Sequence, residues 1–219
     1  MPELLLALLD EEAGSLLVES TDADLAAEIA ADLDLEPEGL ACARPQAMSM
    51  PATGTGPVVR IGGIWHNSVI EGPGRRSVVR FQGCPIHCKG CYVPETWDFE
   101  GGENVSVCEV AKALLSEPHE GITILGGEPF AQPEALSWLI SQLRAREPDV
   151  HILVYSGFTY EALSMRGPDV QYVLDNIDVL IDGPYVVALS SGAGPWTGSA
   201  NQRVIDMHTT LFEGRVVEL

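Results

Sequence analysis

The chain has 219 residues, a hydrophobic fraction of 46% and a formal net charge of −20 at pH 7, which suit a soluble globular protein with room for one full core and a small appendage. So acidic a balance argues against binding a nucleic-acid backbone, because nothing would displace its counterions. No apolar run approaches the roughly 20 residues needed to span a bilayer, and the first residues lack the basic leader of a secretory signal, so we expect a cytoplasmic protein with no membrane role.

Residues 1–57 are predicted to form an acidic N-terminal extension and linker. Thr21 or Asp22 can cap a helix, and the stretch ARPQAMSMPATGTGP that follows it has the turn-rich character of a linker. The apolar side of the helix would be formed by Leu25, Ile29 and Leu33. The pattern favours a small helical or α/β extension and gives it no function.

From residue 58 onward, short strand-like runs alternate with helical patterns. The runs are rich in β-branched residues and mostly apolar on both faces, as in a covered parallel sheet; they are 58–65, 77–81, 121–125, 150–155 and 177–181. Helical patterns lie between them at 108–115, 136–143, 159–165 and 169–175. This alternation predicts right-handed βαβ units in an α/β sheet or open barrel. Ligands of such folds bind at the carboxyl ends of the strands.

The stretch GCPIHCKGCYVPETW places Cys84, Cys88 and Cys91 directly after one of these strand-like runs. Three thiols at the spacing C-x3-C-x2-C suit a soft metal centre. A four-iron cluster held by three cysteines is favoured, because one iron would then remain free. A structural zinc site stays open and would need a fourth ligand, for which His87 or Cys108 are candidates.

Five cysteines in a chain without an export signal indicate reduced thiols rather than a disulfide framework. Outside the loop, Cys42 and Cys108 are expected to be bystanders, Cys108 as a small apolar residue near the start of a helix.

The C-x3-C-x2-C loop resembles the signature of the radical S-adenosyl-L-methionine (SAM) enzymes. Three further stretches are similar to the activases of glycyl radical enzymes, above all to the activating protein of anaerobic ribonucleotide reductase: EGPGRRSVVRFQGC at 71–84, DGPY at 182–185 and GSANQRVI at 198–205. Many radical SAM proteins have an aromatic residue where this chain has Gly90, and the ribonucleotide reductase activases share the glycine. The resemblance covers residues 60–206. It implies that residues 58–219 form a radical SAM core domain, a partial and open parallel β/α barrel.

The resemblance also implies the cofactors and the partners. A 4Fe-4S cluster on Cys84, Cys88 and Cys91 would chelate SAM through its free iron. An electron from a flavodoxin- or ferredoxin-type donor would then cleave the sulfonium and give methionine and a 5′-deoxyadenosyl radical. Because the chain contains no glycyl-radical segment, the hydrogen donor is expected in trans, as a backbone glycine of a large reductase.

The stretch GITILGGEPF is a strand-like run that ends in Gly126, Gly127 and Glu128. The glycines let a ligand approach the backbone and the carboxylate can accept from an ammonium, although the motif alone could be a turn. In the family this motif holds the amino group of the methionine moiety, so these three residues are predicted to bind SAM.

Four other positions are candidates for contacts with SAM. Tyr155 and Ser156 are expected at its ribose or carboxylate, although a core aromatic and a helix cap would also explain them. Asp182 is expected either at the carboxyl ends of the strands, facing the same site, or in a turn. Tyr92 is expected either to line the adenine site or to pack over the cysteine loop.

Candidates for contacting the partner or SAM come from the Gly-Pro-Gly lead-in and the C-terminal motif; they are Glu71, Asn201, Gln202 and Arg203. A surface ion pair between Arg203 and Glu71 is the simpler alternative.

The favoured interpretation is an iron–sulfur radical SAM oxidoreductase that activates a glycyl radical enzyme. Two alternatives stay open. One is a small radical SAM enzyme acting on a free metabolite, similar to the carboxy-deazaguanine synthases. The other is a non-catalytic metal-binding module.

Overall fold

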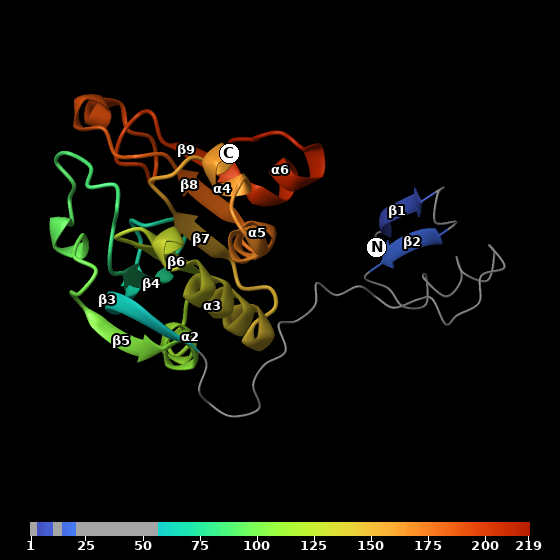
Figure 1. The fold of residues 1–219 in the computed structure, drawn as a ribbon, viewed down its shortest axis with the longest axis horizontal. Coiled ribbons are helices and arrows are strands. Elements are labelled where there is room, and N and C mark those ends of the chain that lie inside the picture. The colour runs from blue at the N-terminus through green and yellow to red at the C-terminus, as the bar shows by residue number, and fades with distance from the viewer. Residues whose placement is uncertain (1–3, 11–14, 21–56) are drawn as a thin grey trace. The chain divides into compact units, whose positions relative to one another are not determined.

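The computed structural model describes residues 4–10, 15–20 and 57–219, which Figure 1 draws in colour. The chain divides into two compact units, Met1–Ser49 and Met50–Leu219. In the first unit, β1 (Leu4–Asp10) pairs antiparallel with β2 (Ser15–Ser20), a hairpin that the sequence analysis did not predict. The helix and linker expected within residues 21–56 lie outside the described residues, and the boundary at residue 57 stays a prediction.

The second unit is built on a seven-stranded sheet with the order β5-β3-β4-β6-β7-β8-β9. The strands are β3 (Val58–Ser68), β4 (Arg76–Phe81), β5 (Glu103–Ser106), β6 (Gly121–Gly126), β7 (Ile152–Tyr155), β8 (Val179–Asp182) and β9 (Arg203–Asp206). The four central strands, β4, β6, β7 and β8, run parallel. This confirms the expected α/β class with a parallel sheet.

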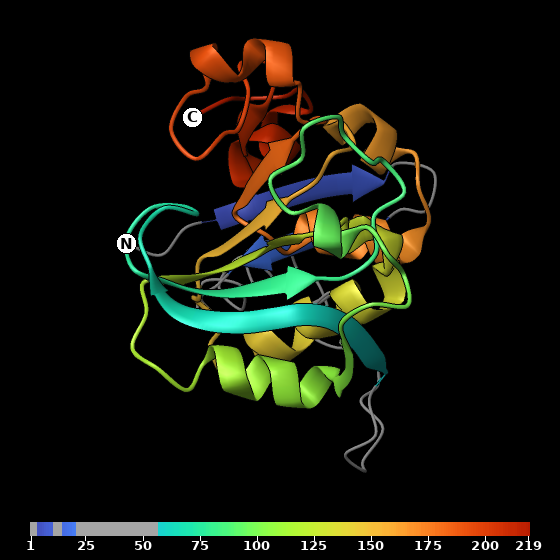
Figure 2. The ribbon, with the colours of Figure 1, turned by 90° about the vertical axis from the view of Figure 1, so that its left-hand side faces the viewer.

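The remaining strands run antiparallel to their neighbours. β3 is joined to β4 by the short segment 69–75 and pairs with it antiparallel, as Figure 2 shows, because a parallel connection would need a crossover of a dozen or more residues. β5 pairs antiparallel with β3, and β9 with β8. No pairing joins β5 to β9 within the described residues, so the sheet stays open, as expected for a partial barrel.

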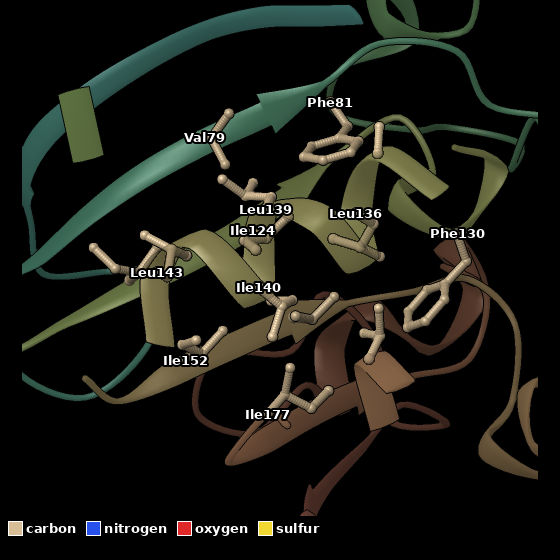
Figure 3. Close-up of a cluster of buried hydrophobic side chains, with 14 of the residues drawn as sticks. Val79, Phe81, Ile124, Phe130, Leu136, Leu139, Ile140, Leu143, Ile152 and Ile177 are labelled. Atoms are coloured by element: carbon tan, nitrogen blue, oxygen red, sulfur yellow. The ribbon is translucent and has the colours of Figure 1, made fainter. Parts of the chain in front are cut away.

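The helices of the second unit are α2 (Val107–Leu114), α3 (Pro133–Arg146), α4 (Tyr160–Ser164), α5 (Pro168–Asp175) and α6 (Met207–Glu213). The predicted apolar stripe of α3 is buried, with Leu136, Leu139, Ile140 and Leu143 all fully inaccessible. Figure 3 shows this stripe against Val79 of β4, Ile124 of β6 and Ile152 of β7. Each such side chain contributes about 2 kcal/mol of hydrophobic stabilisation. Among the described residues, no helix is both long and apolar enough to cross a membrane.

Alternate residues of the same strands point to the opposite face of the sheet, because side chains alternate along a strand. Leu153 of β7 and Ile181 of β8 form a smaller cluster there with the half-buried Tyr155. The segment 69–75 is fixed by hydrogen bonds to its backbone. Thr123 donates to the carbonyl of Glu71 at 2.7 Å, and the fully buried Arg76 donates to the carbonyl of Pro73 at 3.1 Å. This brings Ile70 and Glu71 to the wall of a cavity.

Candidate functional site

A cavity of about 540 Å³ gathers residues from the ends of several strands and from the loops that follow β4 and β8. Cys84, Cys88 and Cys91 line it together with Gly126 and Gly127, which stand at the end of β6. The other predicted site residues in its wall are Glu71, Tyr92, Tyr155, Ser156 and Gln202. Residues that are far apart in the sequence therefore meet at the carboxyl ends of the parallel strands, where α/β folds bind ligands.

The cysteine loop is held in place by backbone hydrogen bonds. The amide of Cys84 donates to the carbonyl of Trp97 at 3.1 Å, and the amide of Cys91 donates to the carbonyl of Cys88 at 3.1 Å. His87 stacks on the Trp97 ring with centroids 4.7 Å apart. His87 therefore packs the loop against the short helix η2 (Pro94–Thr96) and the residue that follows it.

The three thiols of the loop are free, with Cys84 buried and the other two half-buried. Burial raises the pKa of the Cys84 and Cys88 thiols, so a metal must displace their protons when it binds. Within the described residues, no three His, Cys, Asp or Glu side chains are gathered tightly enough to hold a single metal ion. A cluster held at three corners takes one thiolate on each of three irons, so three thiols in the wall of one cavity fit this group.

The other described cysteine, Cys108, does not line the cavity. It lies on α2, and its thiol is 3.6 Å from Oε1 of Gln142 on α3. Cys42 lies outside the described residues.

Gly126 and Gly127 let the end of β6 lie against the backbone that leads into the cysteine loop. Gly126 has φ 120°, and a Cβ there would lie 2.5 Å from the carbonyl oxygen of Phe81. The amide of Gly127 donates to that same oxygen at 2.8 Å, and a side chain at residue 127 would collide with the carbonyl of Gly83. Only glycines allow this close approach, which leaves bare backbone in the cavity wall.

Glu128 follows the two glycines and is fully buried. Its carboxylate accepts hydrogen bonds from the amides of Phe130 at 3.0 Å and Gly157 at 2.8 Å, and from the Ser156 hydroxyl at 3.1 Å. Burial raises the pKa of this carboxyl to about 7. Glu128 does not line the cavity; it joins the end of β6 to the residues that follow β7.

Tyr155 and Ser156 both line the cavity at the end of β7. The Tyr155 hydroxyl donates to the carbonyl of Trp196 at 2.7 Å, and burial raises its pKa. Ser156 does not cap α4, because the cap is Thr159, whose side chain accepts from the amide of Ala162. The helix-cap alternative for Ser156 is therefore wrong.

Asp182 and Arg203 bind each other. Asp182 is buried and accepts from Nε of Arg203 at 2.9 Å and from the amide of Tyr160 at 2.6 Å. Arg203 also holds both carboxylate oxygens of Glu161, at 2.9 and 2.8 Å, and lowers the pKa of Glu161 to about 2. The ion pair between Arg203 and Glu71 that the sequence allowed is wrong; Glu71 accepts a hydrogen bond from Ser68 instead.

Arg203→Met is expected to destabilise the fold by about 3 kcal/mol, because it leaves the buried Asp182 carboxylate without its cation. Glu161→Gln is the matched control. It removes the charge of the exposed acid that pairs with Arg203 and should cost no more than about 1 kcal/mol. Urea unfolding of the three proteins measures both effects. Equal losses for the two variants would contradict the buried pair as the source of the stability.

The C-terminal motif is held by its own side-chain amides. Gln202 accepts from the amide of Gly198 at 2.7 Å and donates to the carbonyl of Gly183 at 3.0 Å, and Asn201 donates to the carbonyl of Pro184 at 2.8 Å. Gln202 lines the cavity, whereas Asn201 lies outside its wall. Both residues fix the loop between β8 and β9.

Tyr92 stands at the rim of the cavity with 72% of its surface exposed. Its hydroxyl lies 3.3 Å from that of Tyr185, and the two rings are 5.0 Å apart. A Cβ at Gly90 would lie in ordinary contact with Val187, at 3.4 Å, and with Tyr185, at 3.8 Å, so the backbone φ of 79° and not a lack of space favours glycine there.

Several residues of the cavity wall were not predicted from the sequence; they are Trp65, Ile70, Arg80, Ile86, Trp97, Tyr185 and Trp196. A signal existed for Arg80, a cation in the apolar run SVVRF, and for Tyr185, which belongs to the DGPY stretch. The three tryptophans gave none, since an isolated tryptophan indicates a core position as readily as a binding site.

Comparison with known proteins places the chain in a family. Residues 70–205 match the family model described as 4Fe-4S single cluster domain. The chain is 34% identical over 140 residues to the anaerobic ribonucleoside-triphosphate reductase-activating protein of Enterobacteria phage T4, an alignment that covers 62% of this chain and 86% of that protein. With the protein of the same name from Escherichia coli strain K12 it shares 31% identity over 144 residues, which cover 62% and 91%.

Two further similarities cover a smaller share of the chain. The pyruvate formate-lyase-activating enzyme of Clostridium pasteurianum is 37% identical over 109 residues, which cover 46% of this chain and 44% of that protein. The crystal structure of QueE from Escherichia coli aligns with a TM-score of 0.36 and 17% identity over 47% of this chain and 53% of that one, too slight a likeness to support an inference. Because the family model spans most of the second unit and the activating proteins are covered over nearly their whole length, the chain belongs to the 4Fe-4S single cluster domain family and is a homologue of the anaerobic ribonucleoside-triphosphate reductase-activating proteins.

Proposed function

We propose that the chain is an iron–sulfur activase that reductively cleaves SAM and generates a glycyl radical on a partner enzyme, anaerobic ribonucleoside-triphosphate reductase. The observation that carries the proposal is that three thiols and the bare Gly126–Gly127 backbone share one cavity, in a homologue of proteins named as activators of that reductase. A flavodoxin- or ferredoxin-type electron donor and a cytoplasmic location stay predictions.

The residues of the cavity suit the two cofactors. Cys84, Cys88 and Cys91 would hold a 4Fe-4S cluster, and together the cluster and SAM would supply the reductive cleavage chemistry of the family. At about 540 Å³ the cavity has the size of a small-molecule site. The backbone carbonyls of Gly126 and Gly127 would orient the amino-acid end of SAM by accepting from its amino group, and Tyr92, Tyr155 and Ser156 would contact its nucleoside end.

Glu128 and Asp182 were predicted from the sequence to bind SAM, but neither lines the cavity, and we propose that they hold this arrangement without touching SAM. Glu128 contributes by fixing the amide of Gly157 and the end of β6. Asp182 contributes by anchoring Arg203, and with it the start of β9.

The partner would approach where the cavity opens. Ile70 and Tyr92 line the cavity and are about three-quarters exposed, at 73% and 72%. Glu71 and Gln202 line it too, and we propose them for contact with the segment of the reductase that carries the glycine. Asn201 and Arg203 would support that contact by holding the C-terminal motif.

The test uses the full chain, reconstituted anaerobically with iron and sulfide and supplied with SAM, a one-electron reductant and a purified anaerobic reductase. The expected result is formation of 5′-deoxyadenosine together with a glycyl radical signal on the reductase by electron paramagnetic resonance. A reductase whose radical-bearing glycine is replaced by alanine is the control and should give no such signal. Turnover of a nucleotide-like acid without any reductase would contradict the activase and favour an enzyme acting on a free metabolite.

A further inference from the structure

Arg80 is the one lysine, arginine or histidine among the described residues that line the cavity. It lies on β4 between Trp65 and Gly126. Its guanidinium is 5.0 Å from the centroid of the Trp65 ring, and its Cγ lies 2.5 Å from the position that a Cβ of residue 126 would take. The missing side chain of Gly126 therefore makes room for the stem of Arg80.

Only some of the N–H groups of the Arg80 guanidinium have a hydrogen-bond partner in the part of the chain that the structure describes. Its Nη1 lies 3.3 Å from Oε1 of Glu95, a residue whose side chain is 63% exposed, so solvent weakens this pair. Its Nε is buried and has no hydrogen-bond partner among the described residues. A buried donor without an acceptor is unfavourable, and an acceptor on a bound ligand would remove that cost.

The side of the Arg80 guanidinium that faces away from Glu95 indicates which group of a ligand it could bind. Nε and Nη2 form one side of the guanidinium, and two parallel N–H groups on that side match the two oxygens of a carboxylate. The other charged residue of the wall, Glu71, is an acid and accepts from Ser68. Within the described wall, Arg80 is therefore the residue suited to an anionic group of the ligand.

We propose that Arg80 binds the carboxylate of the amino-acid moiety of SAM through its Nε and Nη2 groups. The inference rests on the proposed function, in which Gly126 and Gly127 face that end of SAM. Arg80 packs directly on Gly126, and the amino and carboxylate groups of SAM are attached to the same carbon. A residue beside the glycine pair is therefore within reach of the carboxylate.

The test compares two ligands on the anaerobically reconstituted protein by equilibrium dialysis. SAM carries the carboxylate, whereas 5′-deoxy-5′-methylthioadenosine has the same nucleoside without the amino-acid moiety. Arg80→Gln is expected to weaken SAM binding about tenfold or more, since hydrogen bonds between charged groups are stronger than those between neutral ones, and to leave methylthioadenosine binding unchanged. The SAM affinity of Arg80→Lys should lie between those of the wild type and Arg80→Gln, because lysine keeps the positive charge but cannot offer two parallel N–H groups.

Glu95→Gln is the matched control, because it removes the exposed partner of Arg80 and should leave both affinities unchanged. Visible absorbance of the cluster checks that every variant is loaded. Equal loss of both ligands in Arg80→Gln, or unchanged SAM affinity, would overturn the assignment of Arg80 while the proposed function stands. If the wild-type protein binds no SAM, the proposed function and the assignment both fail.

Discussion

Replacing Cys84, Cys88 or Cys91 by alanine is expected to abolish the iron–sulfur cluster, whereas Cys108→Ala should leave it intact. The three loop cysteines line one cavity, and a cluster held by three thiolates cannot spare one without exposing a second iron. Cys108 instead lies against Gln142, between α2 and α3. The measurement is iron and sulfide content with visible absorbance after anaerobic reconstitution, with about four irons for each chain in the wild type and in Cys108→Ala.

Cys108→Ala is a demanding control because it changes the same functional group in the same second unit. Cys42→Ala extends the control to the N-terminal extension and should also keep the cluster. Cluster loss in all five variants would contradict the division of the thiols. A single zinc ion bound by the wild-type protein would contradict the cluster itself.

Local patterns in the sequence are enough to predict the framework of the site. The apolar spacing of Leu136, Leu139 and Leu143 predicts the buried stripe of α3 because burial of such residues depends mainly on their periodicity. The run SVVRF predicts β4, and the cysteine loop follows it at the end of the strand. Because parallel strands end on one side of a sheet, the meeting of this loop with Gly126 and Gly127 also follows from the order of the elements.

The roles of the polar residues could not be read in the same way, because their partners are distant in the sequence. Arg203 binds Asp182, 21 positions away, and Glu161, 42 positions away. Glu128 receives a hydrogen bond from Gly157, 29 positions away. Which charged side chains form a pair depends on how whole helices and strands pack against one another. The short antiparallel strands β5 and β9 escaped prediction because they lack the continuous apolar runs that predicted β7 and β8, which are equally short.

Glu128→Ala is expected to destabilise the fold by about 5 kcal/mol, even with no ligand bound. The change leaves three donors without an acceptor, the buried amide of Phe130, the buried hydroxyl of Ser156 and the half-buried amide of Gly157, and each buried donor costs about 1–3 kcal/mol. Ser156→Ala removes only one donor and should cost about 1 kcal/mol. The midpoint of urea unfolding measures these losses, and the double variant should lose less than their sum, because both changes remove the same hydrogen bond.

The pH dependence of stability distinguishes the buried carboxyl from a residue that serves only to contact SAM. Burial raises the pKa of Glu128 from 4.5 to about 7, so between these pH values the folded chain keeps a proton that the unfolded chain releases. The stability from this group is therefore present below pH 4.5 and falls by up to about 3 kcal/mol as the pH rises through 7. Glu128→Gln cannot titrate, so its deficit relative to the wild type should be larger near pH 5 than near pH 8, because every other group titrates alike in both proteins. A deficit that stays constant with pH, or a ligand-free variant as stable as the wild type, would show that Glu128 does not hold β6 and β7 together.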